Sequence, residues 1–123
     1  MSNNFPGGVW PVMLTPYTKD NQVDYQALAE LIEWYKREGV SGFFAVCQSS
    51  EMFFLSLEER VAVARFVKEH AGDLPVVASG HVSDAFEDQV EEITGILILF
   101  RATAEIEIHC FQCCQELAAE HPG

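Results

Sequence analysis

The sequence predicts an α/β fold with a parallel sheet, and three observations carry this prediction. Short apolar runs begin near residues 9, 43 and 75, at a regular spacing. None of the runs alternates apolar with polar residues, which is typical of strands that are buried on both faces. Each run is followed by a segment with apolar residues at helical spacing. The predicted order is strand, helix, three times over. This pattern alone does not separate a closed barrel from an open doubly wound sheet.

The first unit begins with the run VWPVML at residues 9–14, which we expect to form a buried strand although Pro11 lies within it. Asp24 is a candidate N-cap for the following helix, because its carboxylate can accept from free amides of the first turn. Gly39 supplies a C-terminal stop. The first helix is therefore predicted over residues 24–38.

The second unit begins with the run GFFAVC at residues 42–47, followed by a mixed loop over residues 48–54. Ser56 and Glu59 have the spacing of a capping box, in which each side chain satisfies a backbone amide of the other residue. We expect a helix behind this box, with its end near Gly72.

The third unit begins with PVVAS at residues 75–79. Ser83 is the predicted cap of the third helix, and Gly95 is its predicted end. The inner face of this helix is predicted to carry Phe86, Val90 and Ile93.

The pattern becomes ambiguous after Gly95. Residues 96–100, ILILF, could form a fourth strand, but they follow the third run too closely for the earlier spacing. Residues 104–111 alternate like a strand and also fit helical spacing. We therefore divide the chain into residues 1–95 and an atypical tail, 96–123. The tail is either a fourth strand and helix or the product of a shifted reading frame.

Composition narrows the function classes. The chain has 123 residues, 49% of them apolar, and a formal net charge of −12. Such an acidic chain repels phosphate backbones, so we expect no nucleic-acid or anionic-membrane partner. No signal peptide is visible, and a cytoplasmic location is the default expectation. The cysteines do not form a disulfide framework, and we expect reduced thiols at Cys47, Cys110, Cys113 and Cys114.

Residues 46–60, VCQSSEMFFLSLEER, resemble the loop after the second barrel strand in the dihydrodipicolinate synthase and N-acetylneuraminate lyase family of class I pyruvate-dependent aldolases. That family typically shows Gly-Thr-Thr-Gly-Glu and then Leu-Thr-x-Glu-Glu-Arg. Glu51 stands at the motif glutamate. The other matching positions are Thr15-Pro16, Val23-Asp24, Gly39-Val40-x-Gly42, Leu55-Ser56, Glu58-Glu59-Arg60 and Leu74-Pro75-Val76-Val77-Ala78. The resemblance covers about residues 8–93.

The resemblance implies the first three βα units of a (β/α)8 barrel, a fold that needs about 250 residues. It also implies a lyase or synthase that forms a Schiff base between a lysine and pyruvate or a related 2-keto acid, with no metal or organic cofactor. Barrels of this family commonly associate as dimers or tetramers, so the implied partners are a small 2-keto acid and further copies of the chain.

Gln48, Ser49 and Ser50 are the predicted substrate-binding residues. They follow the carboxyl end of a strand, where barrel active sites are built. The resemblance implies that hydroxyls at positions 48 and 49 hold the keto-acid carboxylate and relay protons. Ser49 keeps its hydroxyl, whereas Gln48 can donate a hydrogen bond but cannot relay in the same way. The departures from the motif, which include Cys47 for glycine, indicate either an altered substrate or loss of lyase chemistry. The simpler alternative to a substrate-binding role is that the loop contains serines only because serine favours turns.

No catalytic residue is predicted in this chain. The family's Schiff-base lysine lies on the sixth strand and its tyrosine near the fifth, and neither stretch is present. The only lysines, Lys19, Lys36 and Lys68, are not at strand ends. We expect Glu51 to be structural, tying its loop to backbone amides, rather than a general acid or base.

Two alternatives to a truncated lyase that is inactive on its own stay open. One is a non-catalytic remnant that only associates with other chains. Phe53 and Phe54 are candidate interface residues, because the resemblance implies association into dimers or tetramers. The other is a small metal-binding protein, although a structural zinc site needs four ligands. The tail segment His109-Cys110-x-x-Cys113-Cys114 looks like half of such a site. The distant candidates for the other half, Cys47, His70 and His81, have no supporting spacing, so we predict no metal site. The acidic helix positions, Glu91 and Glu92 among them, are expected to be solvated.

Overall fold

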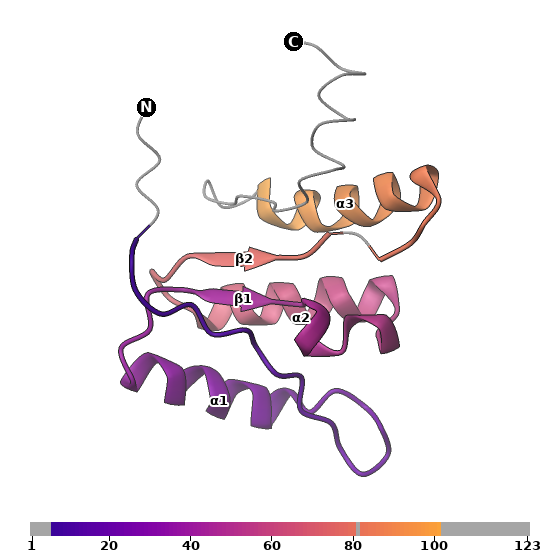
Figure 1. Cartoon of the computed structure of the whole chain (residues 1–123). Coiled ribbons are helices and arrows are strands. Elements are labelled where there is room, and N and C mark those ends of the chain that lie inside the picture. Colours follow the sequence, from indigo (N-terminus) through magenta and orange to yellow (C-terminus); the bar gives the residue numbers. More distant parts are fainter. Residues whose placement is uncertain (1–5, 81, 102–123) are drawn as a thin grey trace.

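The computed structural model describes residues 6–80 and 82–101. Within these ranges the chain alternates helices and short strands, with two 3-10 turns after the first strand (Figure 1). The elements are α1 (Tyr25–Arg37), β1 (Phe43–Ala45), η1 (Gln48–Ser50), η2 (Met52–Phe54), α2 (Leu57–His70), β2 (Val76–Ala78) and α3 (Phe86–Arg101). The predicted α/β order is confirmed, and both strands lie inside the runs expected to form them.

The strands β1 and β2 pair in parallel, with Phe43 opposite Val76 and Ala45 opposite Ala78. Residues 9–14 lie along the other side of β1. There the amide of Phe44 donates to the carbonyl of Pro11 at 3.0 Å. Strand β1 is therefore the middle of three extended segments.

The strand predicted at residues 9–14 is reduced to a single bridge between Val12 and Phe44. The backbone amide of Met13 continues this contact and donates to the carbonyl of Phe44 at 2.9 Å. Pro11 has no N–H with which to extend the ladder toward the N-terminus, so regular pairing stops at this residue. The prediction placed the segment correctly and overestimated its regularity.

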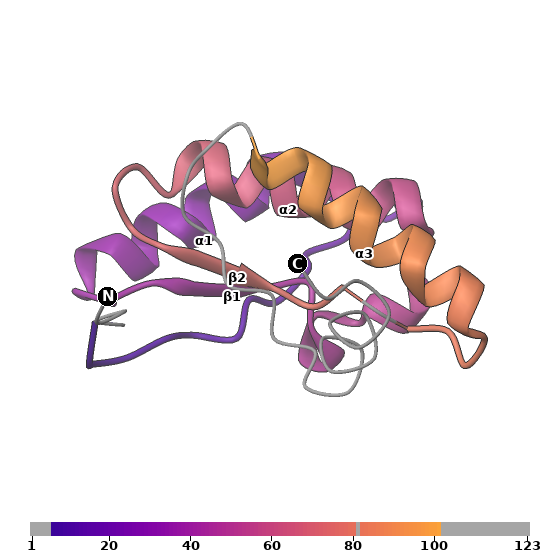
Figure 2. The ribbon, with the colours of Figure 1, turned by 90° about the horizontal axis from the view of Figure 1, so that it is seen from above.

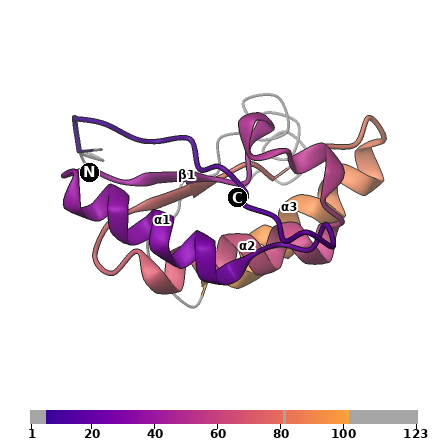
Figure 3. The ribbon, with the colours of Figure 1, turned by 90° about the horizontal axis from the view of Figure 1, so that it is seen from below.

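All three helices cover the same face of the sheet, as Figures 2 and 3 show from above and below. Phe43 and Ala45 of β1 face them and have no exposed surface. The core also contains Met13, Leu28, Ile32, Val63, Ala64, Val67, Val76, Ala78 and Ile96. On the opposite face, Val12 and Leu14 are 39% and 58% exposed. Within the described ranges, the helices therefore cover one apolar face of the sheet. On the other face, the segment of residues 9–14 exposes apolar side chains.

The predicted caps of the first two helices are confirmed. The Asp24 carboxylate accepts from the amide of Ala27 at 3.0 Å and begins α1. Gly39 follows the end of α1 with a φ of +79°, a backbone conformation that glycine adopts without steric cost. Ser56 and Glu59 form both bonds of the capping box before α2. These ends are determined by local side-chain contacts, which is why they can be predicted from the sequence.

Helix α3 differs from its prediction at both ends. Ser83 does not cap it, because the first helical bond runs from the amide of Gln89 to the carbonyl of Ala85. Nor does Gly95 end it, since α3 continues to Arg101. Residues 96–100 are therefore helical and do not form a fourth strand, and the boundary predicted at residue 95 falls inside this helix. A β-carbon on Gly95 would lie 3.6 Å from Val61, so this glycine is at the contact with α2. The rest of the tail, from residue 102, lies outside the described residues.

A buried ion pair joins α2 to α3. The guanidinium of Arg60 donates to the carboxylate of Glu92 at 3.0 Å, and each side chain is only 7% exposed. The prediction that Glu92 is solvated is therefore wrong. None of the helices in the described ranges is long and apolar enough to cross a membrane.

Candidate functional site

The carboxyl ends of β1 and β2 lie at the same edge of the sheet, because the strands are parallel and in register. Two loops leave this edge: residues 46–56 lead from β1 to α2, and residues 79–85 lead from β2 to α3. In Figure 1 both loops lie beyond the arrowheads. This edge is where parallel α/β folds place their ligands, so the two loops form the candidate site.

The β1–α2 loop makes two sharp turns. Val46 and Glu51 have φ values of 48° and 61°, in the left-handed region that glycine favours. This conformation is rare for a β-branched residue such as Val46 and costs of order 1–3 kcal/mol. Between these residues, η1 closes with a hydrogen bond of 2.9 Å from the amide of Ser50 to the carbonyl of Cys47. Surrounding contacts must therefore hold the loop in place.

Ser50 supplies those contacts from inside the fold. It is 1% exposed, and its hydroxyl donates to the carbonyl of Met13. Thr15 donates its hydroxyl to the carbonyl of Ser50 at 2.7 Å. The Cys47 sulfur lies 3.2 Å from the Ser50 hydroxyl oxygen. Because that hydroxyl gives its proton to Met13, the thiol is the donor in this contact. Thr15 was not predicted as a site residue, although its place directly after the first apolar run could have indicated it.

Gln48 and Ser49 are exposed on the same turn. Neither side chain makes a hydrogen bond to another residue in the described ranges. The three predicted substrate-binding residues are therefore adjacent in space but differ in environment. Gln48 and Ser49 present polar groups to solvent, whereas the Ser50 hydroxyl is buried and engaged.

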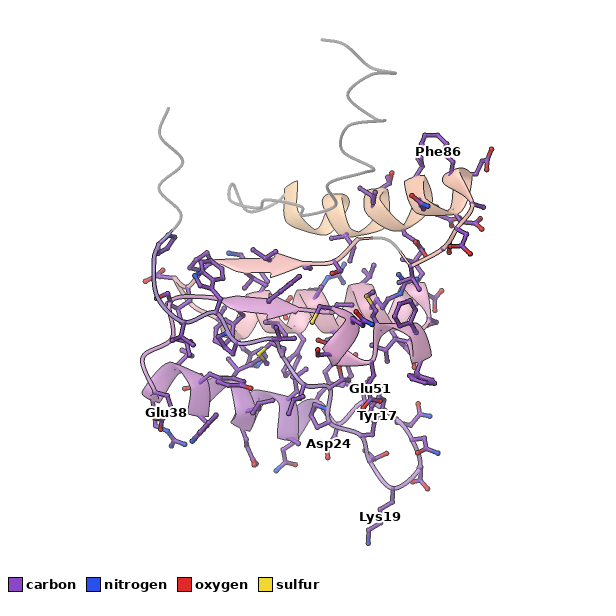
Figure 4. All side chains as sticks on the ribbon, viewed as in Figure 1. Tyr17, Lys19, Asp24, Glu38, Glu51 and Phe86 are labelled. Atoms are coloured by element: carbon purple, nitrogen blue, oxygen red, sulfur yellow. The ribbon has the colours of Figure 1, made fainter. Side chains whose placement is uncertain are left out.

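Tyr17 lies close to Glu51, as the labelled side chains in Figure 4 show. Its hydroxyl is buried and has no hydrogen-bond partner within the described residues. Burial raises the pKa of Tyr17, and the carboxylates of Glu51 and Glu59 raise it further. Tyr17 therefore stays a neutral hydroxyl at neutral pH. The expected contacts of the Glu51 carboxylate with backbone amides are not found among the described residues. Glu51 instead contributes to the turn through its left-handed backbone conformation.

The three lysines lie away from the site. Lys19 is exposed in the turn before α1 and points outward (Figure 4). Lys36, in the last turn of α1, donates to Glu33 at 2.9 Å and to the carbonyl of His70 at 3.2 Å. Lys68 lies within α2. The expectation that none stands at a strand end is confirmed.

Over residues 6–80 and 82–101, no group of three or more histidine, cysteine or acidic side chains is placed to hold a metal ion. The tail residues considered for a metal site, from His109 to Cys114, lie outside the described residues.

Glu92 reaches the second loop from α3. Burial pushes the pKa of its carboxyl upward, but hydrogen bonds from the amide of Val82, from Arg60 and from Ser83 outweigh this effect. The net pKa of Glu92 is lowered. This carboxylate is therefore ionised throughout the neutral range and interacts with both α2 and the β2–α3 loop.

Solved structures with the same arrangement identify the class of fold. A protein from E. coli K12 described as a prophage protein of the dihydrodipicolinic acid synthase family, in complex with pyruvate, aligns with 29% identity and a TM-score of 0.68 over 75% of this chain and 31% of that chain. The N-acetylneuraminate lyase of Mycoplasma synoviae aligns with 26% identity and a TM-score of 0.65, over 75% and 32% of the two chains. The described fold is part of a (β/α)8 barrel.

Sequence relatives agree. The 4-hydroxy-tetrahydrodipicolinate synthase of Chlorobaculum parvum is 32% identical over 80 residues, which are 65% of this chain and 27% of the relative. That of Acidithiobacillus ferrooxidans (strain ATCC 53993) is 35% identical over 101 residues, 81% of this chain and 32% of the relative. The profile of the Dihydrodipicolinate synthetase family matches residues 5–90. The chain belongs to this family and spans about a third or less of the length of these relatives.

The buried and exposed serines of η1 should respond differently to substitution. Ser50→Ala removes the donor to the buried carbonyl of Met13, and such an unsatisfied group costs about 1–3 kcal/mol of unfolding free energy. Ser49→Ala alters an exposed side chain and should change stability by less than about 0.5 kcal/mol. Urea denaturation of the two variants checks this. Equal stabilities would show that the Ser50 contact does not anchor the loop.

The lowered pKa of Glu92 predicts acid sensitivity. Because its folded-state pKa lies below the ordinary value of 4.5, its stabilisation is fully present above pH 4.5 and is lost as the pH falls through the folded-state value. Glu92→Gln should therefore flatten the decline of stability below pH 4.5. The measurement is the unfolding midpoint as a function of pH, with Glu91→Gln, an exposed neighbour on the same helix, as the control. Identical acid profiles for the two variants would contradict it.

Proposed function

We propose that the β1–α2 loop binds the carboxylate of pyruvate or a related 2-keto acid, as part of a Schiff-base lyase or synthase site. We further propose that these 123 residues are inactive on their own. The observation that carries the proposal is the exposed pair Gln48 and Ser49 at the carboxyl edge of β1, in a chain that belongs to the dihydrodipicolinate synthetase family. The pyruvate complex of the E. coli K12 relative supports the substrate class.

The geometry gives each residue a role. The amide nitrogen of Gln48 and the hydroxyl of Ser49 are uncommitted donors, suited to the two oxygens of a carboxylate. Ser50 supports them by fixing the turn through the hydrogen bond from its buried hydroxyl to the carbonyl of Met13. Because both exposed donors are neutral, the site would recognise its ligand by hydrogen bonds, without an ion pair to a basic side chain in this loop.

The chemical step needs an amine that this chain does not place at the site. Imine formation joins a lysine nitrogen to the keto carbon and releases water. Lys36 is held by Glu33 and His70 at the far end of α1, and Lys19 and Lys68 are also away from the loop edge. The mechanism we propose for the complete site uses no metal or organic cofactor, and we expect it to operate in the cytoplasm.

Pyruvate binding tests the site. Ser49→Ala and Gln48→Ala should each weaken pyruvate binding about ten- to a hundredfold, because a hydrogen bond to a charged group contributes about 1.5–3 kcal/mol. Gln26→Ala is the matched control, since it removes the same carboxamide from an exposed position on α1. Isothermal titration calorimetry on the full 123-residue chain gives the affinities. No binding by the unmodified chain, or equal weakening by the control, would refute the proposal.

The same preparation tests inactivity. Borohydride reduction in the presence of pyruvate should leave the mass of the chain unchanged, whereas a full-length relative that forms the imine provides the positive control. A covalent adduct on any of the three lysines would overturn the assignment of inactivity.

We also propose that the chain associates with further copies of itself. Phe53 and Phe54 in η2 are 57% and 82% exposed, next to the candidate site. Adjacent exposed aromatic rings are typical of interface anchors. The non-catalytic alternative predicts the same association without keto-acid binding, so the calorimetry above separates the two hypotheses.

Phe54→Ser should shift the chain toward the monomer, because it removes the most exposed aromatic side chain of the described residues. Trp34→Ser, which alters an aromatic residue on α1 that is 47% exposed, serves as the control. Sedimentation velocity measures the change. The proposed interface fails if the unmodified chain is already monomeric or if only the control dissociates.

A further inference from the structure

The β2–α3 loop is attached to α3 through one buried carboxylate. Glu92 accepts four hydrogen bonds, one from Arg60 on α2 and three from the loop. Its side chain is 7% exposed. A carboxylate in such surroundings is stable only when its acceptor sites are filled, and here the loop fills most of them.

The two carboxylate oxygens have separate partners. Oε1 accepts from Arg60 Nη2 at 3.0 Å and from the Ser83 hydroxyl at 2.9 Å. Oε2 accepts from the backbone amides of Val82 at 2.8 Å and Ser83 at 3.3 Å. An amide side chain has a single acceptor oxygen, so glutamine cannot satisfy both sets.

A second contact holds the same loop one residue further along α3. A β-carbon placed on Gly80 would lie 2.9 Å from Cγ1 of Ile93, so glycine lets the loop backbone approach the helix closely. Ile93 is 4% exposed. Successive residues of α3, Glu92 and Ile93, therefore fix the loop on both sides of residue 81.

Arg60 extends the connection to the other loop. It lies in the first turn of α2, where its backbone amide donates to the carbonyl of Ser56 at 2.9 Å. Ser56 is also the cap at which the β1–α2 loop ends. The path from Ser56 through Arg60 and Glu92 to Val82 thus joins both loops of the candidate site by direct contacts.

Stability alone is a weak reason for a buried ion pair. Its desolvation cost offsets much of the attraction, and apolar residues of similar size are often as stable. The Nε of Arg60 is also buried without a hydrogen-bond partner in the described part of the chain. We therefore expect the Arg60–Glu92 pair to fix the position of the β2–α3 loop more than to add to the free energy of unfolding.

We infer that Glu92 is a positioning residue, which holds the β2–α3 loop in place beside the Gln48–Ser49 turn, with Arg60 orienting its carboxylate. The loop then forms the second wall of the site. That this wall borders a keto acid rests on the proposed function. The ordering of the loop by Glu92 does not rest on it, and the experiment separates the two.

Amide hydrogen exchange on the full chain, followed by NMR, tests the inference. In Glu92→Gln, exchange at Val82 and Ser83 should accelerate about ten- to a hundredfold beyond any change at Leu28 in α1, because their buried acceptor is lost. Glu91→Gln makes the same change in charge on the exposed face and should leave these amides unaffected.

The double variant R60M/E92L distinguishes positioning from packing. It replaces the ion pair with apolar side chains, so the thermal midpoint should return to or exceed that of the unmodified chain. Exchange at Val82 and Ser83 should nevertheless stay fast, since no acceptor is restored. It also provides a folded protein for the measurement if Glu92→Gln alone does not fold.

Protected loop amides in the double variant would overturn the inference, as would acceleration in Glu92→Gln that merely matches Leu28. Pyruvate titration of the same samples gives an independent result. Absence of binding by the unmodified chain would refute the proposed function, while the exchange rates would still decide whether Glu92 orders the loop.

Discussion

The pairing of β1 between residues 9–14 and β2 is the constraint on which the rest of the structure depends. Successive amides of β1 point to opposite sides: Phe43 donates to Pro75, and Phe44 donates to Pro11. The side chain of Phe43 meanwhile reaches the helix-facing core, where it has no exposed surface. Any shift of register by one residue would exchange Phe43 with Phe44 and turn the core residue away from the helices. This register also brings both loops to one edge.

The β1–α2 loop shows how departures from the family's motif can support one another. At positions 47 and 50, where the resembled motif has glycine, Cys47 and Ser50 stand within 3.2 Å of each other. Both are buried, and the Ser50 hydroxyl continues to Met13 on the first segment. These contacts help to hold the left-handed conformation of Val46. The residues at the two departing positions thus contact each other inside the fold. This contact helps the β1–α2 loop to keep its shape without the two glycines of the motif.

Residues with local partners could be predicted from the sequence. Asp24, Ser56 and Glu59 interact with amides three positions away, so the sequence spacing contains the necessary information. The polar turn at residues 48–50 could be placed at the carboxyl edge of the sheet, because it directly follows a predicted strand of a parallel fold.

The failures share a different cause. Glu92 reads as one of several acidic helix residues, and only its tertiary contacts with Arg60 and the β2–α3 loop show that it is buried. Gly95 was expected to end a helix, but it lies within α3 where this helix meets Val61 and Leu57 of α2. Ser83 was expected to cap a helix and instead binds the carboxylate of Glu92. Contacts with other parts of the fold, beyond the spacing of a helix cap, decided each of these positions.

A partial barrel can retain the geometry of its loops because each loop has its anchors nearby. The β1–α2 loop is held by Met13 and Thr15, and the β2–α3 loop by Glu92 and Arg60. All four anchors belong to the first three βα units. The additional length of the relatives would therefore add further loops to the same edge, rather than be needed to shape these two. The loop that we propose for carboxylate binding is therefore held by Met13 and Thr15, apart from the amine that the proposed chemistry requires.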